Sequence, residues 1–214
     1  MTAIKICGIA RTQDALAAAH SGANAIGFVF YANSPRYVMP VRAAEIMRAL
    51  PPFVMSVGLF VDAAADEVMQ TLAITRLDLL QFHGDETPAY CRQIFRQSGV
   101  PYLKALRVRP GLDLLQYAQE YHDAKALLLD AYVEGTHGGT GATFDWALIP
   151  KNLPLPVVLS GGLTPGNVTA AIQAVRPWAV EVSSGVERSG VASKGIKDAA
   201  KIAAFVIGVR NADV

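Results

Sequence analysis

The sequence predicts an α/β protein that folds as a single (β/α)8 TIM barrel over residues 1–214. Eight short apolar segments alternate with longer amphipathic segments, as in parallel sheets that are built from βαβ units. No Pro- or Ser-rich linker divides the chain, whose 214 residues suit one domain of this kind. Glycine-rich turns follow the seventh and eighth apolar segments, where such barrels bind phosphate. An open, doubly wound sheet would show the same alternation, but the count of eight and the position of these turns favour the closed barrel.

The predicted strands are short, almost continuously apolar and bounded by Gly, Pro or charged residues. Strands that are buried on both faces have this pattern. In chain order they cover residues 3–7, 25–30, 54–60, 78–82, 102–108, 126–130, 156–161 and 180–184.

The amphipathic segments between these strands predict the helices. They cover residues 12–21, 41–50, 63–75, 87–98, 111–122, 144–150, 165–175 and 197–207. Helix-start residues support three of them, namely Thr12, Asp62 and the pair Thr164-Pro165. The fifth segment has the weakest pattern, because its polar face is broad.

Composition excludes two classes of partner. Hydrophobic residues make up 52% of the chain and charged residues 17%, and the formal net charge is +1. This balance suits a large buried core and does not attract nucleic acid or an anionic membrane surface. The opening segment MTAIKICGIARTQ lacks the features of a signal peptide, and apolar runs such as AAFVIGV are too short to span a bilayer. We therefore expect a soluble, cytoplasmic protein without nucleic-acid or membrane partners.

The two cysteines, Cys7 and Cys91, do not lie in a Cys-x-x-Cys motif or in a Cys/His cluster. No metal site is therefore predicted, and a disulfide is not expected in a chain without an export signal. Cys91 lies within the helical segment PAYCRQIF, where a free cysteine is usually a small core residue.

Polar side chains gather where the predicted strands end, which is the edge of a (β/α)8 barrel that carries catalytic residues. Lys5 and Cys7 are two residues apart on the first strand, so both side chains point to the same face. The others are Arg36, Asp62, His83, Asp85, Arg107, Asp130, Ser160, Glu181, Ser183 and Ser184.

Two of these strand ends predict phosphate-binding turns. The segments LSGGL and VSSG place Gly161, Gly162, Ser183 and Ser184 after the seventh and eighth strands. Glycines let the backbone approach an anion closely, and N–H groups at a helix N-terminus supply hydrogen-bond donors. Either turn alone could be an ordinary tight turn. Their joint position in the barrel predicts a phosphorylated small molecule as the ligand.

Four side chains are candidates for chemistry or substrate binding, each with a structural alternative. Asp130 closes a buried strand, where a carboxylate needs a partner or a function. Cys7 could act as a base if a nearby positive charge such as Lys5 lowered the pKa of its thiol. His83 is either a substrate contact or a hydrogen-bonded strand-end residue. Arg36 is either a fork for a substrate carboxylate or an exposed loop arginine.

The segment 131–143 contains four glycines. A mobile lid over the ligand is one interpretation, and a plain flexible connector is the other. The sequence leaves both open.

Taken together and in order, these motifs resemble those of the phosphoribosylanthranilate isomerase family. The matching segments include KICGI, GFVFYANSPRYV, LLQFHGDE, LLLDA with GGTGATFDW, LSGGLTPGNV and EVSSGVE followed by GIKD. The resemblance implies an enzyme of tryptophan biosynthesis with the TIM-barrel fold. Its reaction would convert N-(5-phosphoribosyl)anthranilate to 1-(2-carboxyphenylamino)-1-deoxyribulose 5-phosphate by an acid–base Amadori rearrangement.

The resemblance also implies roles for individual residues. Asp130 would be the general acid that opens the furanose ring, and Cys7 the general base that takes the C2′ proton. Arg36 would hold the anthranilate carboxylate, and the two glycine-rich turns would hold the phosphate. The iminium nitrogen is the electron sink, so neither a metal nor an organic cofactor is implied. Glu181 stands where the family usually has Asp, so no role is carried over to it.

Three alternatives remain beside this interpretation. The related aminoaldose isomerase of histidine biosynthesis is expected to have an aspartate in place of Cys7, although activity on its substrate stays open. A pentose-phosphate epimerase would need metal-binding histidines at strand ends, where His20, His122 and His137 do not lie. An inactive phosphate-binding scaffold would have to be separated by assay. The oligomeric state is left as monomer or homodimer.

Overall fold

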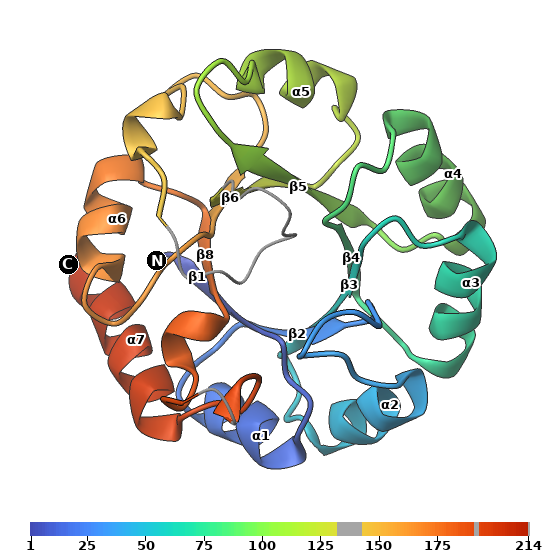
Figure 1. The fold of residues 1–214 in the computed structure, drawn as a ribbon, viewed down its shortest axis with the longest axis horizontal. Helices are drawn as coiled ribbons and strands as arrows, with labels where there is room; N and C mark the ends of the chain where they lie inside the picture. Colours follow the sequence, from blue (N-terminus) through green and yellow to red (C-terminus); the bar gives the residue numbers. More distant parts are fainter. Residues whose placement is uncertain (132–142, 191–192, 214) are drawn as a thin grey trace.

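The computed structural model describes residues 1–131, 143–190 and 193–213. Figure 1 shows the strands as a central ring with the helices around it. In the described part of the chain each strand pairs in parallel with the next, and the eighth pairs with the first, which closes the barrel. The predicted TIM barrel is confirmed, and the doubly wound open sheet is excluded.

The strands of the barrel are β1 to β8 in chain order. Their bounds are Ala3–Cys7, Ala25–Val29, Met55–Phe60, Leu79–Phe82, Tyr102–Val108, Ala126–Ala131, Val157–Leu159 and Ala179–Val182. The first and fifth strands have the predicted bounds, and the others differ by at most two residues at either end. The seventh strand ends early because Ser160 and Gly161 leave the sheet to form the turn that follows it.

The outer layer consists of the helices α1 to α7 and two short 3-10 turns, η1 and η2. The helices cover Thr12–His20, Pro40–Ala49, Ala65–Ile74, Pro88–Ser98, Leu114–Glu120, Val168–Val175 and Ala199–Ala212. The 3-10 turns cover Trp146–Leu148 after β6 and Ser184–Val186 after β8.

Two of the predicted helix starts are wrong. Helix α3 begins at Ala65 without a side-chain cap, and Asp62 instead adopts a left-handed conformation with φ 49°. Its Oδ1 accepts a hydrogen bond from the Asp85 N–H at 2.7 Å. Helix α6 begins only at Val168, so Pro165 lies in the preceding turn. Thr12 is confirmed as the first residue of α1.

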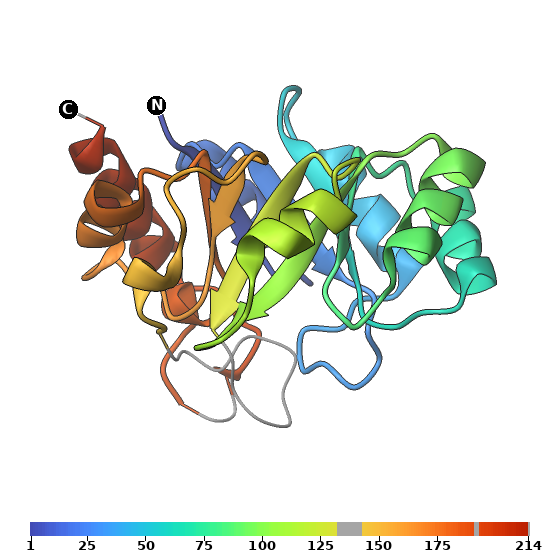
Figure 2. The same cartoon turned by 90° about the horizontal axis from the view of Figure 1, so that it is seen from above.

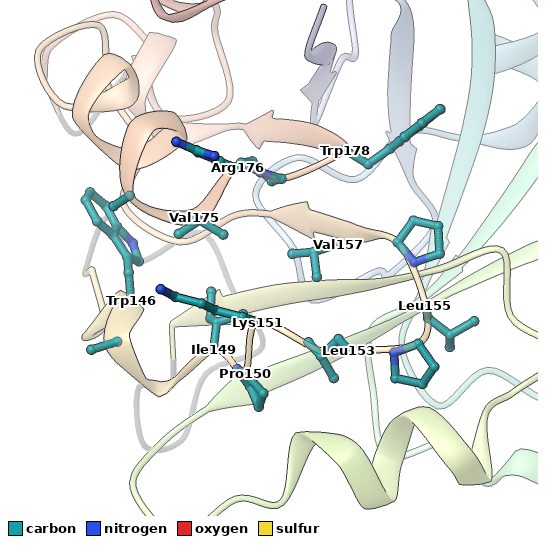
Figure 3. A pocket seen from close by; sticks show the side chains of 15 residues that line it. Trp146, Ile149, Pro150, Lys151, Leu153, Leu155, Val157, Val175, Arg176 and Trp178 are labelled. Carbon is teal, nitrogen blue, oxygen red and sulfur yellow. The ribbon is translucent and has the colours of Figure 1, made fainter.

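The predicted helix over residues 144–150 is wrong. Only η1 forms there, because Pro150 disfavours a helical conformation of the residue before it, and Ile149 is extended with ψ 114°. Figure 3 shows the resulting pocket of about 780 Å³ between this segment and the end of α6, lined in part by Trp146, Lys151 and Arg176. It lies on the outer wall, and none of the predicted site residues lines it.

Apolar side chains close the interior of the barrel at one end. Leu103 of β5, Leu128 of β6 and Val158 of β7 belong to one buried cluster there. Because side chains alternate along a strand, the inward position after Leu128 is Asp130. Polar groups therefore lie above an apolar plug, at the carboxyl ends of the strands. Figure 2 shows the strand arrowheads toward the lower edge and both chain termini at the upper edge.

Candidate active site

The carboxyl ends of the strands bring most of the predicted site residues into one buried region. Cys7, Arg36, His83 and Asp130 are each no more than 7% exposed. They come from β1, the segment after β2, the end of β4 and β6. Side chains that are far apart in the sequence therefore share the mouth of the barrel, as the strand-end positions predict.

Asp130 forms the end of a hydrogen-bonded row of three side chains. Its Oδ2 lies 3.1 Å from Nε2 of His83, and its Oδ1 accepts the N–H of Ala131 at 2.9 Å. Nδ1 of His83 lies 3.1 Å from Nε2 of Gln81, which is fully buried on β4. The structural alternative for His83 thus has direct support, and its contact with substrate stays a prediction. Sequence reasoning missed Gln81, although its spacing of two from His83 was a usable signal.

Cys7 is buried beside the ion pair of Lys5 with Glu181, which joins neighbouring positions of β1 and β8. Burial and the Glu181 carboxylate raise the pKa of the Cys7 thiol, and the Lys5 ammonium lowers it by less. The lowered thiol pKa on which a role as base would depend is therefore not found in this state, because burial and the Glu181 carboxylate outweigh the Lys5 ammonium. Burial acts to lower the pKa of Lys5, but the charges of Cys7 and Glu181 raise it overall.

Gly27 of β2 makes room for the cysteine and the lysine. A Cβ at this position would lie 2.8 Å from Sγ of Cys7 and 2.8 Å from Nζ of Lys5. Real Cβ atoms do not approach neighbouring atoms so closely. A glycine on the strand next to β1 is therefore part of what holds the thiol and the ammonium together.

Arg36 is not an exposed loop arginine. Its guanidinium is buried and binds Glu187 through two hydrogen bonds, from Nε to Oε1 at 2.7 Å and from Nη2 to Oε2 at 3.1 Å. Gly8 makes room for it, since a Cβ there would lie 2.5 Å from Cδ of Arg36 and φ of Gly8 is 75°. An arginine has five N–H donors, and two of them bond to Glu187 within the described part of the chain.

Lys197 connects Arg36 and its carboxylate to the turn after β8. Its Nζ donates to Glu187 at 3.1 Å and to the carbonyl oxygen and hydroxyl of Ser183 at 3.0 and 3.2 Å. Burial and the nearby Arg36 lower the pKa of Lys197, although Glu187 opposes them. Burial acts to raise the pKa of Glu187, but Arg36 and Lys197 bring it below its ordinary value. Two cations around one carboxylate leave a net positive charge, which suits an anionic ligand.

Sequence reasoning assigned no role to Glu187 or Lys197. Both lie in motifs that carry the family resemblance, EVSSGVE and GIKD. The bond between Glu187 and Arg36 joins positions 151 residues apart in the chain, so only the closed barrel brings them together.

The two glycine-rich turns lie against each other. Gly161 and Gly162 have φ of 83° and 61°, a left-handed conformation that favours glycine. A Cβ at Gly161 would lie 2.6 Å from the N–H nitrogen of Ala131, and one at Gly185 would overlap the carbonyl oxygen of Leu163. Ser183 follows β8, and Ser184 opens η2. The turns after β7 and β8 thus form one continuous backbone surface beside Lys197.

Other polar strand ends serve structure. Lys104 of β5 is 2% exposed and donates to Glu86 at 2.8 Å and to the carbonyl oxygen of Gly84 at 2.7 Å. Asp85 forms an ion pair with Arg107 at 2.9 Å. Cys91 is fully buried in α4, where burial raises the pKa of its thiol to about 12. Its prediction as a core residue is confirmed.

The remaining predictions concern the segment 131–143 and the binding of a metal ion. Residues 132–142 lie outside the described part of the chain, so the interpretation of 131–143 as a lid or as a connector stays a prediction. Among the residues that the structure describes, no three His, Cys, Asp or Glu side chains lie close enough together to hold a metal ion.

The fold and the site define a class of protein. A closed (β/α)8 barrel places a buried carboxylate and a buried thiol at strand ends, beside cations and two adjoining glycine-rich turns. This combination is that of a TIM-barrel enzyme that performs acid–base chemistry on a small anionic molecule.

Comparison with known proteins identifies the family. A family model described as N-(5′-phosphoribosyl)anthranilate (PRA) isomerase matches residues 4–207, and the chain belongs to this family. An N-(5′-phosphoribosyl)anthranilate isomerase of Nitrosospira multiformis is 60% identical over 206 residues, which are 96% of this chain and 95% of the relative.

Solved structures of the family share the fold over nearly all of their length. One is a phosphoribosylanthranilate isomerase in complex with reduced 1-(o-carboxyphenylamino)-1-deoxyribulose 5-phosphate. It is 38% identical with a TM-score of 0.85, and the match covers 99% of this chain and 100% of the other. Another is described as monomers generated from the dimeric enzyme of Thermotoga maritima, with 37% identity, a TM-score of 0.83 and the same coverage.

Proposed function

We propose that the chain converts N-(5-phosphoribosyl)anthranilate to 1-(2-carboxyphenylamino)-1-deoxyribulose 5-phosphate in tryptophan biosynthesis. Family membership over residues 4–207 supports the reaction. The observation on which the mechanism rests is the shared burial of the Cys7 thiol and the Asp130 carboxylate at the mouth of the barrel. An aldose–ketose rearrangement needs one acid and one base at the reacting carbons.

Asp130 is the general acid in this mechanism. Its proton goes to the furanose ring oxygen, the bond from C1′ to that oxygen breaks, and C1′ forms an iminium with the anthranilate nitrogen. Positioned proton transfer of this kind contributes roughly 10²- to 10⁴-fold to a rate. His83 holds the carboxylate of Asp130 through the 3.1 Å contact at Oδ2. The acid is therefore oriented before the ligand binds.

Cys7 is the general base. Its thiolate takes the proton from C2′, and the electron pair of that C–H bond moves toward the iminium nitrogen to give an enolamine. The enolamine then tautomerises to the ketone. The thiol must lose its proton before this step, and Lys5 is the neighbouring charge that favours the thiolate. An anionic ligand or a rearrangement of the Lys5–Glu181 pair would change the pKa of the Cys7 thiol, and with it the fraction present as thiolate.

Arg36 and the two turns bind the ends of the substrate. The N–H donors of Arg36 that do not bond to Glu187 in the described part of the chain suit the anthranilate carboxylate. The backbone of Gly161, Gly162, Ser183 and Ser184, with the ammonium of Lys197 beside it, suits the phosphate. His83 contacts the sugar from the opposite side of the mouth.

The mechanism uses neither a metal nor an organic cofactor, because the substrate's own nitrogen accepts the electron pair. We further propose a cytoplasmic enzyme without nucleic-acid or membrane partners that works as a monomer or a homodimer. The described residues include no helix that is both long and apolar enough to cross a membrane. The Thermotoga maritima relative is described as dimeric, and sedimentation of this chain would decide between the two states.

The reaction can be tested with substrate made in situ from anthranilate and phosphoribosyl pyrophosphate, whose fluorescence disappears on turnover. The wild type, Cys7→Ser and Asp130→Asn would be compared in the presence of EDTA. Rapid turnover by the wild type, slowed at least about a hundredfold in both variants, supports the acid–base roles. A folded wild type without turnover would contradict the proposal and favour the histidine-pathway substrate or an inactive scaffold, which the same assay with that substrate separates.

A further inference from the structure

Gln81 is a buried polar side chain that the proposed mechanism does not use. It lies on β4 with no exposed surface, two residues before His83 and on the same face of the strand. Its Nε2 contacts Nδ1 of His83 at 3.1 Å, whereas its Oε1 has no hydrogen-bond partner among the described residues. Buried polar atoms are nearly always hydrogen-bonded, and an exception often has a functional reason.

The Gln81 amide determines which nitrogen of His83 carries the proton. With Nε2 of Gln81 donating, Nδ1 of a neutral His83 must accept, and the imidazole proton is on Nε2. His83 then donates to Oδ2 of Asp130 across 3.1 Å. A carboxylate oxygen that accepts this bond needs no proton, so this arrangement holds Asp130 in its ionised form.

Rotating the Gln81 amide by 180° exchanges Oε1 and Nε2. The hydrogen bond between Gln81 and His83 and the one between His83 and Asp130 then both reverse direction. Oε1 of Gln81 then accepts from Nδ1–H of His83, and the free Nε2 of His83 accepts from a protonated Oδ2 of Asp130. The second arrangement holds one more proton, taken from solvent and shared between Asp130 and His83 across their hydrogen bond. On Oδ2 this proton gives the acid that the mechanism needs, and on Nε2 it gives an imidazolium; in both forms Nδ1–H donates to Oε1 of Gln81.

The surroundings of Gln81 give little reason for one amide orientation over the other. In the first orientation Oε1 has no partner among the described residues, so turning the amide breaks no hydrogen bond at that atom. The charged side chains on three other strands, β1, β8 and β5, have partners of their own. Lys5 and Glu181 bind each other, and Arg107, which is level with Asp130 on β5, binds Asp85.

We propose that Gln81 is a positioning residue whose amide orientation sets the tautomer of His83 and thereby couples to the protonation of Asp130. This inference rests on the proposed role of Asp130 as general acid. It adds a residue that touches neither the substrate nor the reacting atoms.

The tautomer of His83 can be measured in the ligand-free enzyme by ¹⁵N NMR as a function of pH, independently of turnover. In the wild type, we expect Nδ1 to carry no proton at high pH and to be protonated at low pH, with the change at the pH where activity falls. Gln81→Met keeps the size of the side chain and removes both polar atoms. In this variant, we expect His83 to keep one tautomer throughout.

Kinetics give the second readout. In Gln81→Met, Nδ1 of His83 has lost the Gln81 amide. Leaving Nδ1–H without an acceptor costs more than leaving Nδ1 without a donor, because buried N–H groups rarely lack an acceptor. We therefore expect the alkaline limb of the pH profile to move to lower pH. We also expect kcat to fall by about tenfold, with KM within about twofold, since the acid rather than the binding of substrate is affected. Gln97→Met, on the exposed face of α4, is the matched control and should leave both unchanged.

Two results would overturn the inference. One is a wild-type His83 that keeps a single tautomer between pH 5 and 9, measured in a folded and active enzyme. The other is a Gln81→Met variant with wild-type kcat and pH profile. Failure of the proposed function would look different, because the wild type would then lack turnover whatever the tautomer of His83.

Discussion

Replacing Glu187 with glutamine removes the negative charge that Arg36 and Lys197 share. Oε1 of Glu187 accepts from Nε of Arg36 at 2.7 Å and from Nζ of Lys197 at 3.1 Å, and Oε2 accepts from Nη2 of Arg36 at 3.1 Å. None of the three side chains is more than 8% exposed. A glutamine has the same size but keeps one acceptor, and its NH2 group would face a cation.

The size of the effect follows from burial. Removing one partner of a buried ion pair costs about 3–5 kcal/mol, because the remaining charges stay buried without compensation. For a chain of 214 residues, each kcal/mol lowers Tm by about 2–4 °C. Glu187→Gln should therefore unfold about 6–20 °C below the wild type, by the same conversion.

The pH dependence identifies the carboxylate as the cause. The pKa of Glu187 is lower in the folded protein than its ordinary value of 4.5. A carboxylate of this kind stabilises the fold above its unfolded pKa, and the contribution is lost as the pH falls through the folded value. The difference in unfolding free energy between wild type and Glu187→Gln should be full at pH 7 and should narrow below pH 4.5.

The assay is urea unfolding between pH 3.5 and 7, with steady-state kinetics at pH 7. Arg36 loses one of its two fixed hydrogen bonds to this side chain, so we expect KM to rise at least about tenfold with a smaller change in kcat. Glu45→Gln is the matched control, because its pair with Arg42 is nearly half exposed and such pairs contribute about 0–1 kcal/mol. Destabilisation no larger than that of the control, or a difference that does not change with pH, would refute the reasoning.

Three further predictions follow from other parts of the barrel. Lys104→Met leaves Glu86 buried without its ammonium and should cost about 3–5 kcal/mol in urea unfolding; a loss below about 1 kcal/mol would mean that water reaches the carboxylate. Gly185→Ala places a methyl group against the carbonyl oxygen of Leu163, so the turns after β7 and β8 must separate. Inorganic phosphate should then inhibit the variant about tenfold more weakly than the wild type. The control is Gly111→Ala, an exposed position where a Cβ would meet no atom within 4 Å; equal inhibition of Gly185→Ala and the wild type would remove these turns from the phosphate site. Because burial and Glu181 raise the pKa of Cys7, less thiolate is present at a given pH, and iodoacetamide should modify Cys7 in a Cys91→Ser background at a rate that still rises above pH 9. Lys5→Met should slow this reaction further, whereas a rate that levels off below pH 8 would show a lowered pKa instead.

Local patterns were sufficient for much of the fold. Strands β1 and β5 have their predicted bounds because each is a largely apolar run with clear limits, Thr2 and Gly8 for the first and Pro101 and Arg109 for the second. The predicted helix over 144–150 is wrong because Pro150 restricts the residue before it, a signal that was present in the sequence. The start of α3 differs because Asp62 bonds to the N–H of Asp85 on the next loop, which local patterns do not reveal.

The sequence alone determined the barrel, the strand ends that carry polar groups and the candidate pair Cys7 and Asp130. Strand periodicity and glycine-rich turns are short-range features, so a single chain displays them directly. Only the tertiary structure decided the partners of these groups: Glu187 for Arg36, His83 for Asp130, and Glu181 for Lys5. Closure of the barrel brings together charges that lie 47 to 176 residues apart in these pairs. Removing those charges from water then sets the protonation of the site, and raises the pKa of Cys7, whereas a role as base would depend on a lowered one.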